Sequence, residues 1–388
     1  MNQAPAIQKK NLYPDTMHAL CPYFAMFPPD FARSAIKKYS QPGDLVADPF
    51  SGRGTTLLEA RILKRKAIAN DINPVAVAIT KAKSSTINLA SGLKKIEALR
   101  NEYNKINKSQ LKNEVKQLPV FFGFAFHEET LPQILWLRKR LKNIRTIELI
   151  FIKTLCLSYL HGETQKTKLV YFSNNLPHTY CPKPEYSIRF WKEKKMIAPK
   201  IDVFDILADR CKFRLENSKQ HLIKDNGLSL LGDARNFGSN LKKLTKEKIK
   251  LVVTSPPYIG ITSYEEDQWL RLWFLGGSPY PSRGKITKDD LISSETRYIN
   301  FLSKCWKSIG KVMASNGIVV CRLGQSAKDH FPLKKIMQQS ILKGGDKFQI
   351  IKVKFSPFKK NRQAVMFGSK AIKKSGEYDF VLKFRNAS

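Results

Sequence analysis

The sequence is poor in acidic residues and in paired cysteines. Only 32 Asp and Glu stand against 68 Lys and Arg, which gives a formal net charge of +36 at pH 7. The six cysteines are scattered, with no Cys-x-x-Cys and no close histidine pairing, so we expect a reducing compartment and no metal site. No apolar run approaches the roughly 20 residues of a membrane helix, and no signal peptide is evident. We therefore expect a cytoplasmic protein without a membrane partner.

The excess of positive charge predicts a polyanionic partner, because Lys and Arg that neutralise phosphates release counterions. Residues 86–226 carry 26 Lys and Arg against 14 Asp and Glu, and residues 331–388 carry 14 against 3. The C-terminal segment is thus the denser basic patch, with Lys359, Lys360 and Arg362 as candidates for phosphate contacts. A generally basic composition is the alternative, since lysine is abundant throughout the chain.

The most informative segment is LVVTSPPY at residues 251–258. Its apolar run predicts a buried strand, and the prolines then impose a stiff turn because they neither continue a ladder nor start a helix freely. The turn presents the Ser255 hydroxyl, the Pro256 carbonyl and the flat face of Tyr258 at the end of the strand. Two acceptors beside a stacking surface suit a planar heterocycle with an exocyclic amine. A Pro-Pro turn that merely closes a core strand is the structural alternative.

A second segment predicts a cofactor loop. DLVADPFSGRGTTLLEA at residues 44–60 has the pattern of a strand, a glycine loop and a helix. Gly52 and Gly54 allow a tight turn and the close approach of a ligand, at the switch point where α/β sheets bind cofactors. A short strand over residues 66–74 then carries Asp71, about 20 residues beyond the loop, where doubly wound folds place the acid that grips ribose hydroxyls.

With these two segments the chain resembles the amino-methyltransferases of DNA that use S-adenosylmethionine (AdoMet). DPFSGRGT at residues 48–55 resembles the AdoMet loop of the family, and TSPPY at residues 254–258 resembles its catalytic tetrapeptide with one flanking residue. LGDA at residues 231–234 is similar to the end of the third strand, whose acid lies near the cofactor adenine. Weaker similarities are Phe27-Pro28 with residues 40–44, which precede the loop, and residues 317–324 as a later core strand.

The resemblance implies an α/β fold: an AdoMet-dependent methyltransferase (Rossmann-like) sheet with a long, mostly helical insertion. We assign residues 18–84 and 228–388 to the methyltransferase domain. Residues 85–227 form the insertion, which is far longer than an ordinary α/β connection. In related enzymes such an insertion recognises the target sequence, whereas a helical brace on the sheet is the alternative role. The order of the motifs departs from the commonest family arrangements, so recognition residues cannot be assigned by analogy.

Periodicity predicts the coarser organisation. Residues 1–17 have the composition of a polar, poorly ordered lead. Trp269, Leu270, Trp273 and Phe274 fall at helical spacing, and we expect them in the core rather than stacked on bases. The other expected elements are helices over residues 94–108 and 203–219, one long helix or a helical pair over residues 131–160, an ordered loop over residues 172–184, a helix closed by glycine over residues 263–277, and a hairpin formed by residues 349–354 and 378–384.

The family resemblance implies a role for each motif residue. The base amine would donate to the Ser255 hydroxyl and the Pro256 carbonyl, and the extruded base would stack on Tyr258, without a covalent intermediate or a metal. The expected catalytic residues are Ser255, Pro256, Pro257 and Tyr258. The expected cofactor-binding residues are Phe27, Asp48, Phe50, Gly52, Gly54, Thr55, Asp71 and Asp233. Further candidates are Tyr264 at the pocket mouth and, for DNA contact, Asn174, His178, Tyr180 and Lys183.

The implied function is site-specific methylation of double-stranded DNA on the exocyclic N4 of a flipped-out cytosine. It would serve restriction-modification, with a cognate endonuclease as partner, or an orphan modification. Ser255 favours cytosine, because in the family Asp or Asn at that position usually accompanies adenine. The alternatives are an N6-adenine enzyme, an RNA base amino-methyltransferase, and a non-catalytic nucleic-acid-binding module. A nicotinamide dehydrogenase would leave the tetrapeptide unexplained, and cytosine-C5 chemistry needs a Pro-Cys pair that this chain lacks.

Overall fold

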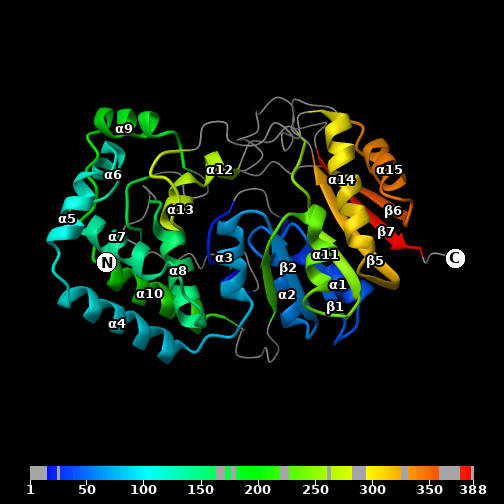
Figure 1. The fold of residues 1–388 in the computed structure, drawn as a ribbon, viewed down its shortest axis with the longest axis horizontal. Helices are drawn as coiled ribbons and strands as arrows, with labels where there is room; N and C mark the ends of the chain where they lie inside the picture. The colour runs from blue at the N-terminus through cyan, green and yellow to red at the C-terminus, as the bar shows by residue number, and fades with distance from the viewer. Residues whose placement is uncertain are drawn as a thin grey trace, which may run out of the picture.

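The structure, a computed structural model, is built on a seven-stranded sheet. The sheet lies on one side of the molecule, and a group of helices lies on the other (Figure 1). The residues that the structure describes are 15–23, 27–162, 171–175, 181–218, 227–259, 264–281, 294–324, 331–357 and 376–385. The strands are β1 (Leu45–Asp48), β2 (Lys66–Asp71), β3 (Leu228–Leu231), β4 (Ile249–Thr254), β5 (Met313–Gly324), β6 (Phe348–Pro357) and β7 (Gly376–Phe384).

The strands lie in the order β3-β2-β1-β4-β5-β7-β6. The first five are mutually parallel, β7 runs antiparallel to β5, and β6 pairs antiparallel with β7. The order reverses between β1 and β4, and α/β sheets bind ligands at such a switch point. The predicted Rossmann-like sheet and its terminal hairpin are therefore confirmed.

Helices cover both faces of this sheet. On one face α11 (Phe237–Lys242), α14 (Glu295–Gly310) and α15 (Leu333–Lys343) enclose an apolar core with the inner side chains of β4, β5 and β7. On the other face α1 (Pro29–Tyr39) and α2 (Thr55–Ile62) pack over β1, β2 and β4. The third helix, α3 (Pro74–Lys83), lies between the sheet and the separate group of helices (Figure 1).

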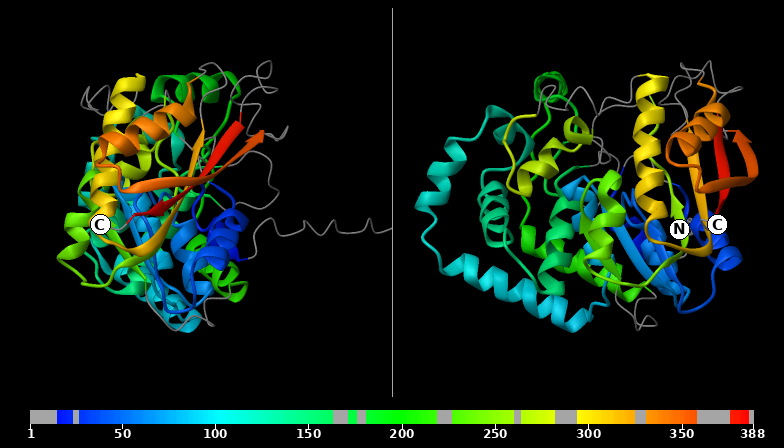
Figure 2. Two further views of the ribbon diagram at one scale, coloured as in Figure 1. Left: turned by 90° about the vertical axis from the view of Figure 1, so that its right-hand side faces the viewer. Right: turned by 45° about the vertical axis from the view of Figure 1, so that its right-hand side comes forward.

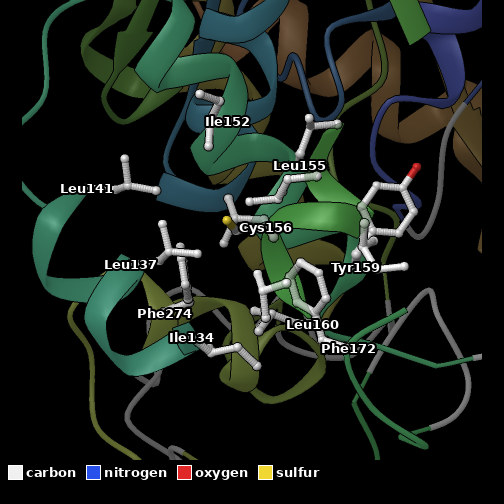
Figure 3. Close-up of a cluster of buried hydrophobic side chains, with 14 of the residues drawn as sticks. Ile134, Leu137, Leu141, Ile152, Leu155, Cys156, Tyr159, Leu160, Phe172 and Phe274 are labelled. Atoms are coloured by element: carbon white, nitrogen blue, oxygen red, sulfur yellow. The ribbon is translucent and has the colours of Figure 1, made fainter. Parts of the chain in front are cut away.

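The segment between β2 and β3 forms that separate group of helices. Its members share one apolar core, in which Leu137, Ile152 and Leu155 are fully buried (Figure 3). The predicted helices are confirmed, and the apolar stretch over residues 131–160 is a helical pair, α7 and α8. The helices are α4 (Leu89–Lys105), α5 (Ser109–Lys116), α6 (Val120–Ala125), α7 (Thr130–Arg140), α8 (Ile147–Tyr159), α9 (Pro184–Glu193) and α10 (Val203–Glu216).

The segment after β4 returns to these helices rather than to the sheet. It forms α12 (Tyr264–Asp267) and α13 (Trp269–Phe274), which lie against the insertion in both figures (Figures 1 and 2). The buried Arg271 donates from Nε to Leu157 O at 2.9 Å and from Nη1 to Gln268 Oε1 at 2.6 Å. Gln268 leaves the helical conformation with φ −112°. The prediction of one helix over residues 263–277 was therefore wrong, because Gln268 interrupts it.

The prediction that this stretch supplies core residues is confirmed. Trp269, Leu270, Trp273 and Phe274 are all buried and belong to the core of the insertion helices. Gly276, with φ 110°, ends the segment in a conformation that favours glycine. This core contains side chains that precede β4 in the sequence and side chains that follow it. It therefore attaches the segment just after the tetrapeptide to the insertion.

The predicted polar lead is structured at its end. A 3-10 helix, η1 (Thr16–Ala19), is capped by Asp15, and Met17 and His18 are fully buried. His18 Nε2 lies 2.6 Å from Glu59 Oε1 on α2. The expectation of poor order was wrong for residues 15–17, because their burial against α2 and α10 outweighs their polar composition. The rest of the lead, residues 1–14, lies outside the described residues.

All six cysteines are buried and free. Each helix in the described ranges is too short or too polar to cross a membrane.

Candidate active site

The chain turns sharply after β1 at two glycines. Gly52 and Gly54 have φ values of 48° and 77°, in the left-handed region that favours glycine. A Cβ on Gly54 would lie 3.0 Å from Thr80 Cγ2, which is tighter than an ordinary contact. Gly54 is the N-cap of α2, whose first residue, Thr55, is buried. The predicted sequence of strand, glycine loop and helix is confirmed.

Asp71 ties this loop to the end of β2. Its Oδ2 accepts from the Gly52 amide at 2.8 Å and its Oδ1 from the Asn73 amide at 2.9 Å. The Ser51 amide donates to Asn70 O at 2.9 Å, which adds a second link between loop and strand. Burial raises the pKa of Asp71 to about 6. Asp71, which the sequence spacing placed near the glycine loop, thus contacts that loop directly.

We expect Asp71→Ala to weaken AdoMet binding by about 1–3 kcal/mol, the size of hydrogen bonds lost to a charged acceptor. Calorimetric titration with AdoMet measures the change. Asp44→Ala is the matched control, because its carboxylate caps the Gln41 amide at the start of β1. An unchanged dissociation constant in Asp71→Ala would contradict a role in ribose binding.

Asp48 is the most constrained acid of the site. It is 1% exposed, and its Oδ1 accepts from Thr254 Oγ1 at 2.6 Å and from the Phe50 amide at 3.1 Å. Its Oδ2 is buried without a hydrogen-bond partner in the part of the chain that the structure describes, as is the hydroxyl of Ser51. Burial raises the pKa of Asp48 to about 7. A buried acceptor with one free oxygen fits a cationic donor such as the amino group of AdoMet.

The tetrapeptide follows β4 directly. Because β4 pairs in parallel with β1, Thr254 and Asp48 end neighbouring strands at the same edge of the sheet. Ser255 and Tyr258 are half-buried, Pro256 is buried and Pro257 is exposed. The Tyr258 hydroxyl donates to Glu377 Oε1 at 2.8 Å. The two motifs that lie about 200 residues apart in the chain are thus joined by one hydrogen bond.

Three other predicted cofactor residues have protein partners. Phe27 is 7% exposed and packs edge-on against Phe31 at 5.1 Å between ring centres. Phe50 is half-buried in the loop, with its ring 5.8 Å from that of Phe301 on α14. Asp233 follows β3 and caps the short helix η3 (Ala234–Asn236).

The carboxylate of Asp233 is shared with Arg235. Asp233 Oδ1 accepts from the Arg235 amide at 2.7 Å, and Oδ2 accepts from Nε at 2.8 Å and from Nη2 at 2.5 Å. Despite partial burial, these contacts lower the pKa of Asp233. A ligand at this edge would therefore meet an arginine-paired carboxylate rather than a lone acid.

Several functional candidates escaped the sequence analysis. The Thr254 hydroxyl binds Asp48, and Glu377 binds Tyr258 from a strand more than 100 residues downstream. The hydroxyl of Tyr298 on α14 is buried without a partner among the residues described. No local pattern marks these three, because their contacts form only when distant strands and helices meet.

The proposed DNA contacts are only partly visible. Asn174 is 8% exposed, whereas Lys183 is exposed at the start of α9. The structure does not describe His178, Tyr180, Lys359, Lys360 and Arg362, nor the side chain of Tyr264, the candidate for the pocket mouth. In the described ranges no group of three His, Cys, Asp or Glu is arranged to hold a metal.

The strand order, with a glycine loop after β1 and an acid after β2, defines the Rossmann-like fold of AdoMet-dependent methyltransferases. Comparison with known proteins adds a resemblance to one family. The family model N6_N4_Mtase, described as DNA methylase, matches residues 3–82. These residues include the glycine loop and Asp71.

Two curated relatives are type II methyltransferases by name. The type II methyltransferase M.BsoBI of Geobacillus stearothermophilus is 26% identical over 286 residues, which cover 67% of this chain and 53% of the relative. The type II methyltransferase M.MjaII of Methanocaldococcus jannaschii is 32% identical over 80 residues, 21% of this chain and 15% of the relative. The chain thus spans about half or less of the length of these relatives. The matches confirm the resemblance to the DNA amino-methyltransferase family, whose cofactor is AdoMet.

Matches among solved structures are distant. TrmN from Thermus thermophilus is 11% identical with a TM-score of 0.34, over 95% of this chain and 51% of that chain. The rRNA methyltransferase aviRa from Streptomyces viridochromogenes is 9% identical with a TM-score of 0.37, over 98% of this chain and 94% of that chain.

Proposed function

We propose that the chain transfers a methyl group from AdoMet to an exocyclic amine of a base in double-stranded DNA. The observation that carries the proposal is the hydrogen bond of 2.6 Å between Thr254 Oγ1 and Asp48 Oδ1. It holds the tetrapeptide and the cofactor loop together at the switch point of the sheet. A cofactor in the loop and a base at the tetrapeptide would therefore meet.

We propose the following division of the cofactor site. The free oxygen of Asp48 and the loop amides would hold the methionine end, and Asp71 the ribose. Asp233, with its partner Arg235, would border the adenine. When bound, AdoMet supplies the electrophilic methyl group. The other residues proposed for this site are Phe27, Phe50, Gly52, Gly54 and Thr55.

The tetrapeptide would hold and orient the base. An exocyclic amine is a poor nucleophile because its lone pair is delocalised into the ring. The Ser255 hydroxyl and the Pro256 carbonyl would accept its two hydrogens and draw the nitrogen toward tetrahedral geometry, so that the lone pair faces the methyl group. Pro257 keeps the turn stiff, and Tyr258 would stack on the extruded ring, a contact worth about 1–3 kcal/mol.

Transfer of a tritiated methyl group from AdoMet tests this function. We would compare duplex DNA with bulk tRNA as acceptors at equal nucleotide concentration, with the Ser255→Ala variant as the blank. Transfer to DNA above the blank supports the proposal. Transfer to tRNA alone would support an RNA enzyme instead, and AdoMet binding without transfer to either would support a non-catalytic nucleic-acid-binding module.

We expect the product to be N4-methylcytosine rather than N6-methyladenine. The Ser255 hydroxyl is short and neutral, and in the family serine at this position usually accompanies cytosine. Hydrogen bonding alone discriminates poorly, since both bases place a ring nitrogen beside the amine. Nucleoside digestion and mass spectrometry of methylated DNA identify the product. A methyladenosine peak without methylcytidine would overturn this assignment.

We also propose that the insertion, residues 85–227, contributes to target recognition. Its helices have a core of their own, and the sequence of residues 86–226 carries 26 Lys and Arg. The chain after the tetrapeptide packs into that core through α13. DNA held by the insertion would therefore lie near the tetrapeptide. If the methyl mark protects host DNA, a cognate restriction endonuclease is the expected partner.

DNA affinity should fall steeply with salt, because so basic a chain makes several phosphate contacts. Fluorescence anisotropy of a labelled duplex measures the slope of log affinity against log salt. Lys352→Glu with Lys354→Glu, at two exposed positions of β6, should reduce this slope by about one per lost contact. The control is Lys242→Glu with Lys246→Glu, at exposed positions before β4. A slope near zero in the wild type would contradict the electrostatic account.

A further inference from the structure

The side chain of Tyr258 is held by two strands that no motif connects to the tetrapeptide. Its ring lies so close to Gly324, the last residue of β5, that a Cβ there would clash with the ring. Its hydroxyl donates to Glu377 Oε1 on β7 at 2.8 Å. Gly324 and Glu377 are register partners in the ladder between β5 and β7. The ring therefore reaches both strands at one level of the sheet.

Glu377 is itself held by Arg322. Arg322 Nη1 lies 3.1 Å from Glu377 Oε2, so the two carboxylate oxygens of Glu377 contact different groups. The guanidinium also donates to Asp379, from Nε at 2.7 Å and from Nη2 at 2.9 Å, and lies 4.0 Å from the ring centre of Phe31. The Arg322 side chain is 10% exposed. Because a guanidinium is a planar fork, these contacts fix its orientation and that of Glu377.

The proline turn by itself leaves the Tyr258 ring free to rotate. Pro256 and Pro257 preset the backbone, whereas a tyrosine side chain keeps two torsions of its own. A hydrogen bond at the hydroxyl end restricts both torsions, and a charged acceptor makes it stronger than a neutral one would. Stacking on a base needs only the ring. Stacking alone therefore does not explain why the hydroxyl has a half-buried, charged acceptor.

We propose that Glu377, held by Arg322, is a positioning residue that fixes the Tyr258 ring in the pose required for stacking on the extruded base. The inference rests on the proposed function, since the pose matters only if a base docks on the ring. In this role Glu377 would act through the Tyr258 hydroxyl, without a contact of its own to the base or the cofactor. If Glu377 served only to link β7 to β5 through Arg322, its replacement would lower the melting temperature without a specific effect on kcat.

A double-mutant cycle separates these two roles. It compares the wild type, Tyr258→Phe, Glu377→Ala and the double variant in kcat, KM for DNA, Kd for AdoMet and melting temperature. We expect each single substitution to lower kcat by about ten-fold, as for one lost hydrogen bond to a charged group, with the Kd for AdoMet unchanged. The double variant should be no slower than the slower single variant, because both remove the same contact. The proposal would be overturned if the two losses in kcat multiplied in the double variant, or if kcat were unchanged in Glu377→Ala.

Glu247→Ala is the matched control, because this carboxylate pairs with Lys66 at 3.0 Å on the surface beside β2 and β4. It should leave kcat unchanged. If Glu377→Ala does not fold, Glu377→Met takes its place in the cycle, since it keeps much of the side-chain volume and removes the oxygen that accepts from the Tyr258 hydroxyl. Asp379 would still pair with Arg322 in either variant, so the guanidinium would not be left alone.

A fluorine resonance tests the contact without reference to activity. In protein labelled with 3-fluorotyrosine, the 19F signal lost in Tyr258→Phe belongs to Tyr258. We expect the Glu377 variant to shift this signal and Glu247→Ala to leave it in place. An unshifted signal would overturn the positioning role even in an active enzyme. Absence of methyl transfer in the wild type would overturn the proposed function instead, while the signal would still report on the hydrogen bond.

Discussion

Ser255→Ala should abolish measurable methyl transfer, a loss of at least about 100-fold in kcat, and leave AdoMet binding intact. Losses of this size follow the removal of one group that stabilises the reacting atoms. The half-buried Ser255 lies beyond the end of β4, whereas the preceding Thr254 makes the contact with Asp48. The substitution therefore removes an acceptor for the base amine without touching the cofactor loop. Single-turnover kinetics with DNA and calorimetry with AdoMet measure the two properties separately.

Tyr258→Ala should have the same pattern, because it removes the stacking surface and the hydroxyl together. Ser315→Ala, at an exposed position near the start of β5, is the matched control and should behave as the wild type. Joint loss of folding and cofactor binding in Ser255→Ala or Tyr258→Ala would show that the turn is structural. Methyl transfer at the wild-type rate in either variant would contradict the proposed mechanism.

Asp48→Asn should weaken AdoMet binding more than any other substitution in the loop and should remove its dependence on pH. With a pKa raised to about 7, the Asp48 carboxyl is mostly protonated below pH 7 and ionised above it. Only the ionised form pairs with a cationic amino group. AdoMet affinity should therefore rise by up to about ten-fold per pH unit as the pH increases toward 7, and level off above it.

The pH dependence of binding is measured by calorimetry between pH 6 and 8, a range chosen around the pKa of about 7. Asp44→Asn is the control, since its carboxylate lies at the other end of β1 and caps the Gln41 amide. It should keep the rise in affinity that the wild type has. A flat profile in the wild type would contradict the assignment of Asp48 to the amino group.

The cofactor loop could be predicted because its signal is local. Gly52 and Gly54 adopt backbone conformations that other residues rarely take, so their spacing after an apolar strand already specifies the turn. The prolines of the tetrapeptide act in the same way. The partners of these segments follow no local rule. Thr254 reaches Asp48 because two strands about 200 residues apart pair in parallel. Arg235 pairs with Asp233, a partner that no sequence pattern indicated.

Burial could be predicted, but not the core in which a residue is buried. The spacing of Trp269 and Trp273 indicated an apolar helix face, and both residues are buried. They join the insertion rather than the sheet, with their rings against Phe121 and Phe122 of α6, and no periodicity encodes this partnership. Residues 15–17 have a polar composition, and their order arises from the fit of Met17 and His18 against α2 and α10.

The sequence by itself determined the sheet, the loop, the tetrapeptide and the family resemblance, because these depend on backbone preferences and apolar patterns within short segments. Tertiary structure alone decided which groups meet: Thr254 with Asp48, Tyr258 with Glu377, and α13 with the insertion. These contacts depend on strand order and on register, because a register shift of one residue turns each side chain of a strand to the other face of the sheet. The residue types of the candidate site could therefore be recognised in the sequence, whereas the contacts between them are set only by the folded sheet.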